Sequence, residues 1–401
     1  MSRAIATVVC LLSALAANWT FAAECDSTFQ NANHLYKCAL SKDPRIRSLA
    51  AKEKERAGRI SEAKQLPNPV GEFEGTDREI SGSIVQPIEI GGKRSARENL
   101  GEIENQASLI EDQLELGEVA LEIAQALNRF HQLATKMELL EATKRSLANL
   151  TSRLRAKAVR TPEERVAVGL FGMQSTLIET RLISVQREQA ETRAVLESSI
   201  GRKLTSTDQL RFPEKRTWPN LSELKNSESI RLRLKEIAVR RLEGALKVQQ
   251  SLAWPDLAIG PYFNQDRVAG ESSFGAKIEF GLPLWNRNRG AKLRAEGEFE
   301  RLKVASEQTL MQERLAFEAL SESYNTLVRF LNQSASSKSL QQSLKETLDL
   351  FSRGMIQPSN VIETYRTAFE TLEAVQDAEA SAVLQYWTIQ IAKGSVPKEI
   401  P

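Results

Sequence analysis

The stretch QPIEIGGKR at residues 86–94 decides the fold, because a stretch of the same kind, GLPLWNRNRG, stands at residues 281–290. Each one ends a short, proline-containing strand pair and continues directly into a long helical pattern. A proline-marked strand start precedes each stretch, LPNP at residues 66–69 and AWPD at residues 253–256. This duplication predicts an internal repeat with one supersecondary unit in each half of the chain.

The composition is typical of long helices, and the charge does not favour nucleic-acid binding. Aromatic residues make up 6% of the 401 residues, and charged residues make up 26%. The formal net charge is +2, with both signs spread along the chain. Nucleic-acid binding proteins usually carry a clustered basic face instead. We therefore expect a mainly helical protein that does not bind nucleic acid.

Residues 1–23 have the pattern of a secretory signal peptide. Arg3 supplies the positive charge, residues 4–17 are mostly apolar, and the small residues Ala22 and Ala23 offer a cleavage site. The alternative is a buried N-terminal helix. No later stretch has the length and apolarity of a transmembrane helix.

Cleavage after the signal peptide leaves two cysteines, Cys25 and Cys38, in the mature chain. Two closely spaced cysteines in an exported protein favour a disulfide, which here ties the mature N-terminus to the first helix. Two free thiols are the alternative.

The predicted elements follow the same order in both halves of the chain. Each half is expected to contain a helix, a β-hairpin and a long helical hairpin, and Gly91, Gly92 and Gly290 mark the passages from strand to helix. The expected bounds are a first repeat over residues 24–201 (hairpin about 68–90, helical hairpin about 93–201), a connector over 202–226, a second repeat over 227–394 (hairpin about 256–285, helical hairpin about 290–394) and a loose C-terminal tail over 395–401.

The long helix expected from about residue 93 to residue 157 reaches on the order of 90 Å. Its apolar residues alternate at spacings of four and three, which predicts supercoiling against a partner. Two strands in each half make four in the chain, whereas the smallest membrane barrels need about eight. This mismatch disappears if several chains share one barrel and one helical tube. The apolar residues that alternate along the long helix expected over residues 93–157 are Val119, Ile123, Ala126, Phe130, Leu133, Met137 and Leu140.

In their order and duplication, the stretches at residues 66–69, 86–94 and 281–290 resemble those of the TolC-like outer-membrane efflux channel family. Within this family, the chain is most similar to the heavy-metal (CzcC/CusC-like) branch. The segment GMIQPSNVIE at residues 354–363 is also similar. The resemblance implies a mainly α fold with a small membrane β-barrel. In this arrangement a homotrimer shares a twelve-stranded barrel and a periplasmic α-helical tunnel, and residues 202–226 become an equatorial connector.

The resemblance also implies the function and the partners. We expect the outer-membrane channel of a tripartite efflux system, a passive export duct from periplasm to exterior for heavy-metal cations. Its partners would be a periplasmic adaptor (membrane fusion protein), an inner-membrane RND-type pump and outer-membrane lipid. The alternatives are a soluble periplasmic coiled-coil or adaptor protein, a helical scaffold, and the same channel serving drugs or other small molecules.

No motif in the sequence indicates catalysis or a cofactor. Only two histidines occur, His34 and His131, and neither has zinc-ligand spacing. The sequence Gly91-Gly92-Lys93 lacks the flanking residues of a phosphate-binding loop. We therefore expect no enzymatic activity and no cofactor, and no metal ligands are assigned.

By resemblance, the periplasmic aperture lies at the breaks between the long helices. A carboxylate near a symmetric constriction becomes a ring of three, which favours cations. The candidates are Glu163, Glu164 and Glu363, although the first two can equally be first-turn residues that complement a helix dipole. Asn360 stands where family members often carry an aspartate.

Four further residues have two possible roles each. Arg160 and Arg353 precede the breaks and either hold a closed state through salt bridges between chains or face water. Trp254 and Trp285 flank the second hairpin and either mark the periplasmic rim of the barrel or pack at its junction with the helices.

The first hairpin departs from the family pattern, because it is short and charged. The band that faces lipid looks thin there. The charged residues are Glu72, Glu74, Asp77, Arg78 and Glu79.

Overall fold

The computed structural model describes residues 25, 28–205, 210, 212, 216–219 and 229–400, apart from the side chain of Leu310. The predicted signal peptide and most of the predicted connector lie outside the described residues. The chain divides into two compact units. Unit 1 comprises residues 1–48, 115–227 and 317–401, and unit 2 comprises residues 49–114 and 228–316.

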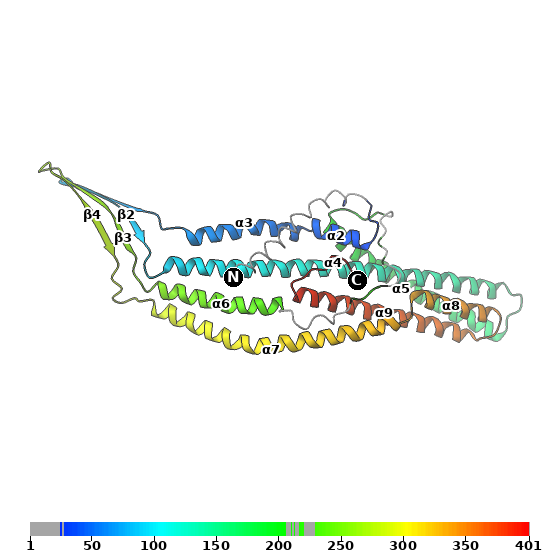
Figure 1. Cartoon of the computed structure of the whole chain (residues 1–401). Helices are drawn as coiled ribbons and strands as arrows, with labels where there is room; N and C mark the ends of the chain where they lie inside the picture. Colours follow the sequence, from blue (N-terminus) through cyan, green and yellow to red (C-terminus); the bar gives the residue numbers. More distant parts are fainter. Residues whose placement is uncertain are drawn as a thin grey trace. The chain divides into compact units, whose positions relative to one another are not determined.

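The described elements occur in the order expected from the sequence (Figure 1). The second long helix is divided at residues 334–336, and Ser336 caps the helix that follows. The elements are α2 (Ala32–Lys42), α3 (Pro44–Lys64), β1 (Val70–Gly75), β2 (Glu79–Ile88), α4 (Lys93–Ala156), α5 (Pro162–Ile200), α6 (Ile230–Ser251), β3 (Leu257–Asp266), β4 (Ser272–Phe280), α7 (Arg289–Gln333), α8 (Ser337–Ser352) and α9 (Pro358–Ala392).

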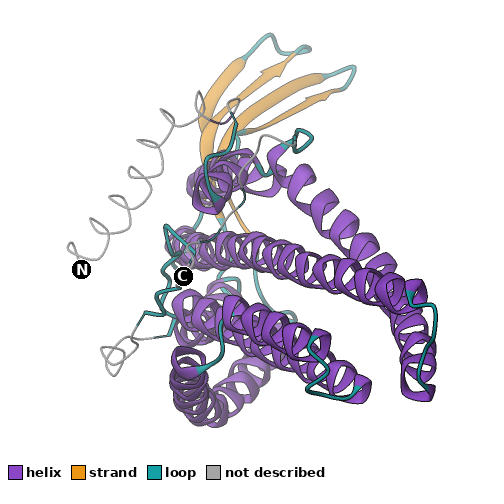
Figure 2. Ribbon diagram, turned by 90° about the vertical axis from the view of Figure 1, so that its right-hand side faces the viewer, coloured by secondary structure: helices purple, strands orange, loops and turns teal. Residues whose placement is uncertain are grey.

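Unit 2 contains one antiparallel sheet in the order β1-β2-β3-β4, drawn in orange in Figure 2. The two predicted hairpins therefore join into a single four-stranded sheet through the pairing of β2 with β3. The helices of this unit pack through a small apolar cluster that joins α4 to α6 and includes Ile103 and Ile237. Arg56 of α3 forms an ion pair with Asp112 of α4 beside this cluster.

Unit 1 contains two buried apolar clusters. The larger cluster joins α2, α4, α5, α7 and α9, and its largest fully buried side chains include Trp387 and Tyr324. The second joins α4, α5, α8 and α9, and the rings of Phe171 and Phe351 meet edge to face there, with centroids 5.5 Å apart. The heptad line predicted on α4 is partly buried in these clusters, as expected for a helix packed against partners.

His131 of α4 is a packed residue of unit 1. Its ring lies 5.0 Å from the ring of Phe212, measured between centroids. Burial, together with the nearby charge of Arg216, lowers the pKa of His131 to about 4, so this side chain is neutral at neutral pH.

The N-terminal segment and the C-terminal tail are bonded to each other. Cys25 and Cys38 form a disulfide, with Sγ atoms 2.11 Å apart. The Tyr36 hydroxyl donates to the carbonyl of Pro397 over 2.8 Å, and the amide of Ile400 donates to Asn33 over 2.8 Å.

The expectation of a loose tail is therefore wrong. Ile400 is only 7% exposed and belongs to the larger cluster, so burial of an apolar side chain near the chain end holds the tail in place.

Candidate functional site

The register of the sheet in unit 2 divides its side chains between two faces. Neighbouring strands place paired residues on the same face, and successive residues alternate between faces. One face, which we call the apolar face, carries no charged residue. It consists of Gly71, Phe73, Gly75, Ile80, Gly82, Ile84, Gln86, Ile88, Leu257, Ile259, Pro261, Phe263, Gln265, Ser272, Phe274, Ala276, Ile278 and Phe280.

Every charged residue of the four strands lies on the other face, which we call the charged face. In the first hairpin, Glu72, Glu74 and Glu79 therefore share one side of the sheet, and Asp77 and Arg78 lie in the turn between the strands. β1 contributes Phe73, which is 84% exposed, to the apolar face. The charged residues are Glu72, Glu74, Glu79, Asp266, Lys277 and Glu279.

A row of aromatic residues crosses the apolar face. Phe73 pairs with Gly82, which pairs with Phe263, which pairs with Phe274. The Phe73 ring covers Gly82 so closely that a Cβ atom there would lie 3.0 Å from it. The rings of Phe263 and Phe274 lie 5.3 Å apart between centroids. Phe73 and Phe274 are 84% and 83% exposed, whereas Phe263 between them is half-buried.

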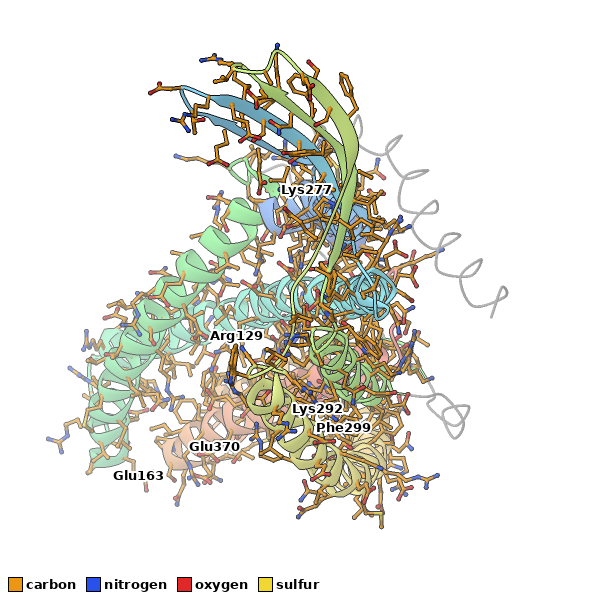
Figure 3. All side chains as sticks on the ribbon, turned by 90° about the vertical axis from the view of Figure 1, so that its left-hand side faces the viewer. Arg129, Glu163, Lys277, Lys292, Phe299 and Glu370 are labelled. Atoms are coloured by element: carbon orange, nitrogen blue, oxygen red, sulfur yellow. A yellow bond between two sulfur atoms is a disulfide. The ribbon has the colours of Figure 1, made fainter. Side chains whose placement is uncertain are left out.

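Ion pairs connect the strands across the charged face. Lys277 of β4 contacts Glu279 of the same strand over 2.5 Å, and it also forms an ion pair with Glu72 of β1. Asn264 of β3 hydrogen-bonds to Glu79 of β2. Figure 3 labels Lys277 among the side chains of the sheet. The charged face is therefore an ordered polar surface.

Two glycines, Gly91 and Gly92, form the first passage from strand to helix. Gly91 and Gly92 have φ angles of 73° and 75°, in the left-handed region. The Trp254 ring packs directly on Gly91, which favours the packing role for this tryptophan. Just beyond, Lys93 is 9% exposed at its side chain and pairs with Asp256 over 2.6 Å, tying α4 to the start of β3.

The second passage differs from the first. Gly290 lies in the first turn of α7, and the left-handed residue is Asn288, with φ 56°. The Asn288 side chain donates to the carbonyl of Gln249 over 2.9 Å, which ties this turn to the end of α6. Trp285 is 93% exposed, which is compatible with the rim role proposed from the sequence.

The break between α4 and α5 in unit 1 is organised by a capping box. The Thr161 side chain accepts from the backbone of Glu164, and the Glu164 side chain accepts from the backbone of Thr161. Lys157 donates to Glu164 over 2.5 Å. These bonds, with the charges of Lys157 and Arg160, hold the pKa of Glu164 below its usual value. Glu164 therefore serves the helix start, whereas Glu163 is exposed (Figure 3).

The break between α8 and α9 lies at the same end of unit 1 as the first break (Figure 1). Arg353 pairs with Asp349 over 2.6 Å within its own helix. Glu363 pairs with Arg366 over 2.5 Å, which lowers the pKa of Glu363. The backbone N–H of Asn360 donates to the carbonyl of Gln357 over 3.1 Å. At this break, Arg353 and Glu363 therefore both form ion pairs with nearby residues of the same helix within one chain.

Sequence reasoning missed three of these features. The Lys277–Glu72 pair joins strands that are 205 positions apart, so no local pattern indicates it. Arg366, the partner of Glu363, was detectable from its spacing of three residues on one helix face. The capping box was detectable as the sequence Thr161-Pro162-Glu163-Glu164.

Two features are absent from the described part of the chain. Within these residues, no group of three or more histidine, cysteine, aspartate or glutamate side chains is arranged to hold a metal ion. None of the described helices combines the length and apolarity that a membrane span requires.

Comparisons with known proteins give one curated relative and a set of solved structures. No family model matches the chain. The relative is the cobalt-zinc-cadmium resistance protein CzcC of Cupriavidus metallidurans, which is 27% identical over 264 residues. The match covers 61% of this chain and 60% of the relative, so it spans less than two thirds of the relative's length.

The similar structures cover nearly the whole chain at low sequence identity. CusC, from a study of conformational changes in folding and transmembrane channel formation, has a TM-score of 0.69 at 14% identity and covers 92% of this chain and 94% of its own. The outer membrane protein VceC of Vibrio cholerae has a TM-score of 0.67 at 15% identity, with coverages of 91% and 96%. The MtrE outer membrane channel of Neisseria gonorrhoeae, in its open state, has a TM-score of 0.67 at 12% identity, with coverages of 93% and 91%.

Proposed function

The chain has the fold of the TolC-like outer-membrane efflux channels, and on this premise we propose that it is the outer-membrane channel of a tripartite efflux system. The observation that carries the proposal is the separation of apolar and charged residues on the two faces of the sheet. One face is apolar and bears exposed aromatics, and the other holds every charge of the four strands. A sheet of this kind suits a wall between lipid and a water-filled lumen.

Three copies of the chain would complete the wall. Within one chain, β1 and β4 are the two edges of the sheet, and open edges cannot face hydrocarbon because their backbone groups would stay unsatisfied. If β4 of each copy pairs with β1 of the next, a homotrimer closes a twelve-stranded barrel in the outer membrane. The two repeats, residues 24–201 and 227–394, then supply one hairpin and one helical hairpin each.

The helical hairpins would form the periplasmic tunnel, and their breaks would form its aperture. Glu163 and Glu363 are exposed at these breaks, and in a trimer each becomes a ring of three carboxylates that favours cations. Arg353 and Arg160 belong to the same aperture. A periplasmic adaptor and an inner-membrane RND-type pump would complete the assembly.

We propose heavy-metal cations as the substrate class, and the similarity to CzcC supports this choice.

Many apolar residues of the long helices, such as Val304 on α7 (70% exposed), remain uncovered in one chain, as expected if neighbouring copies bury them. Export through such a duct is passive and needs no catalytic group or cofactor. The alternative substrates are drugs or other small molecules.

The first test is membrane fractionation of cells that express the full-length chain, followed by sizing in detergent. We expect a trimer in the outer-membrane fraction. A soluble periplasmic monomer would contradict the proposal and favour a coiled-coil or adaptor role.

The aperture is tested by conductance of the purified trimer in a planar bilayer. Glu363→Gln should reduce the preference for cations, because it removes one ring of three charges. Glu370→Gln is the matched control, since Glu370 lies on the same helix and also contacts Arg366, over 3.5 Å. An equal effect of both variants would show that Glu363 has no special position.

A further inference from the structure

The charged face of the sheet contains one basic residue, Lys277, among five carboxylates. Register places Gly260 opposite Lys277 on β3, and Gly275 lies two residues earlier on the same face of β4. Neither neighbour has a side chain, so the lysine side chain is free to extend over the sheet. Its side chain is 28% exposed, which is less than that of either carboxylate it contacts.

The Lys277 ammonium group lies between two carboxylates. Glu279 comes from the same strand, and Glu72 comes from β1 at the opposite edge of the sheet. Both carboxylates contact the same nitrogen atom. Two carboxylates that converge on one point can together bind a divalent cation. The ammonium group occupies that point.

We propose that Lys277 is a built-in counter-ion that keeps divalent cations from binding to Glu72 and Glu279 inside the channel. This inference rests on the proposed function. It identifies a residue that sets how readily metal cations leave the charged face as they pass through the channel. Conduction requires that ions enter a site favourably but leave it readily. A bare pair of carboxylates, repeated three times in a trimer, would hold a divalent metal ion too long. With the lysine in place, the charged face attracts cations through its other carboxylates without retaining them.

The test uses the full-length trimer in a planar bilayer, with Zn²⁺ added to a KCl solution as the probe. The wild-type channel should show little block. Lys277→Gln should be blocked at a Zn²⁺ concentration about tenfold lower or less, because the two carboxylates lose their counter-ion. Lys277→Arg keeps the charge and should behave as the wild type.

The double variant Lys277→Gln/Glu72→Gln identifies the site. It should lose the added sensitivity to Zn²⁺, because only one carboxylate remains. Ser273→Gln, on the same face of β4, is the control for a polar substitution and should leave the block unchanged. Titration calorimetry of the detergent-solubilised Lys277→Gln and Lys277→Met proteins gives a second readout, in which Zn²⁺ binding should appear that the wild type lacks.

The outcomes separate the two proposals. If the trimer conducts and Zn²⁺ acts equally on wild type and Lys277→Gln in both measurements, the inference about Lys277 is overturned while the channel stands. If no variant or wild-type protein conducts or forms trimers, the proposed function fails, and the inference fails with it.

Discussion

At Gly91 the chain passes from a strand into α4 in a backbone conformation that favours glycine. The neighbouring Gly92 has nearly the same φ angle, but the surroundings of the two glycines differ. Trp254 lies against Gly91, whereas a Cβ atom at Gly92 would meet nothing within 4 Å. A substitution at Gly92 therefore tests backbone strain alone, whereas a substitution at Gly91 tests backbone strain together with packing against Trp254.

Gly91→Ala should lower the thermal midpoint of the protein more than Gly92→Ala. Both variants place alanine in the left-handed region, at about 1 kcal/mol of destabilisation each. Only Gly91→Ala also forces Trp254 to move. Thermal unfolding followed by circular dichroism measures the difference. Equal midpoints for the two variants would mean that the Trp254 contact contributes nothing to this junction.

At the scale of elements, the two helix breaks of unit 1 start their return helices in different ways. α5 begins with a full capping box at Thr161 and a proline at the start of the helix. α9 also begins with a proline, but its N-cap residue Gln357 makes no side-chain cap bond. We therefore expect the start of α5 to be more resistant to opening than the start of α9.

Thr161→Ala should speed amide hydrogen exchange of Glu164 about fivefold, because loss of the N-cap costs about 1 kcal/mol. Gln357→Ala is the matched control, and exchange in the first turn of α9 should stay unchanged. Hydrogen exchange followed by mass spectrometry measures both. Unchanged exchange in Thr161→Ala would show that the Lys157–Glu164 pair alone holds this helix start.

At the scale of the molecule, the two ends of the chain stabilise unit 1 together. Tyr36, Lys37 and Asn33 each bond to the tail, and the disulfide joins Cys38 of the same helix to Cys25. Tyr36 also packs edge to face on Trp387 of α9, with centroids 5.6 Å apart. The tail thus completes the larger apolar cluster.

Deleting residues 399–401 should destabilise the protein by about 2 kcal/mol, mainly through the loss of the buried Ile400 side chain. The exposed Lys37–Glu399 pair should contribute little of this. Glu399→Gln is therefore the control, expected to unfold near the wild-type temperature. If the deletion and Glu399→Gln unfold together, Ile400 burial does not hold the tail.

The sequence by itself determined the order of the elements, the helix breaks and the glycine passage at Gly91, because these depend on local periodicity and turn chemistry. The tertiary structure alone decided which face of the sheet receives the charges, since register depends on pairing between segments far apart in the chain. For the same reason it alone revealed the Lys277–Glu72 pair. It also revealed the docked tail, because the burial of Ile400 depends on side chains that other helices supply.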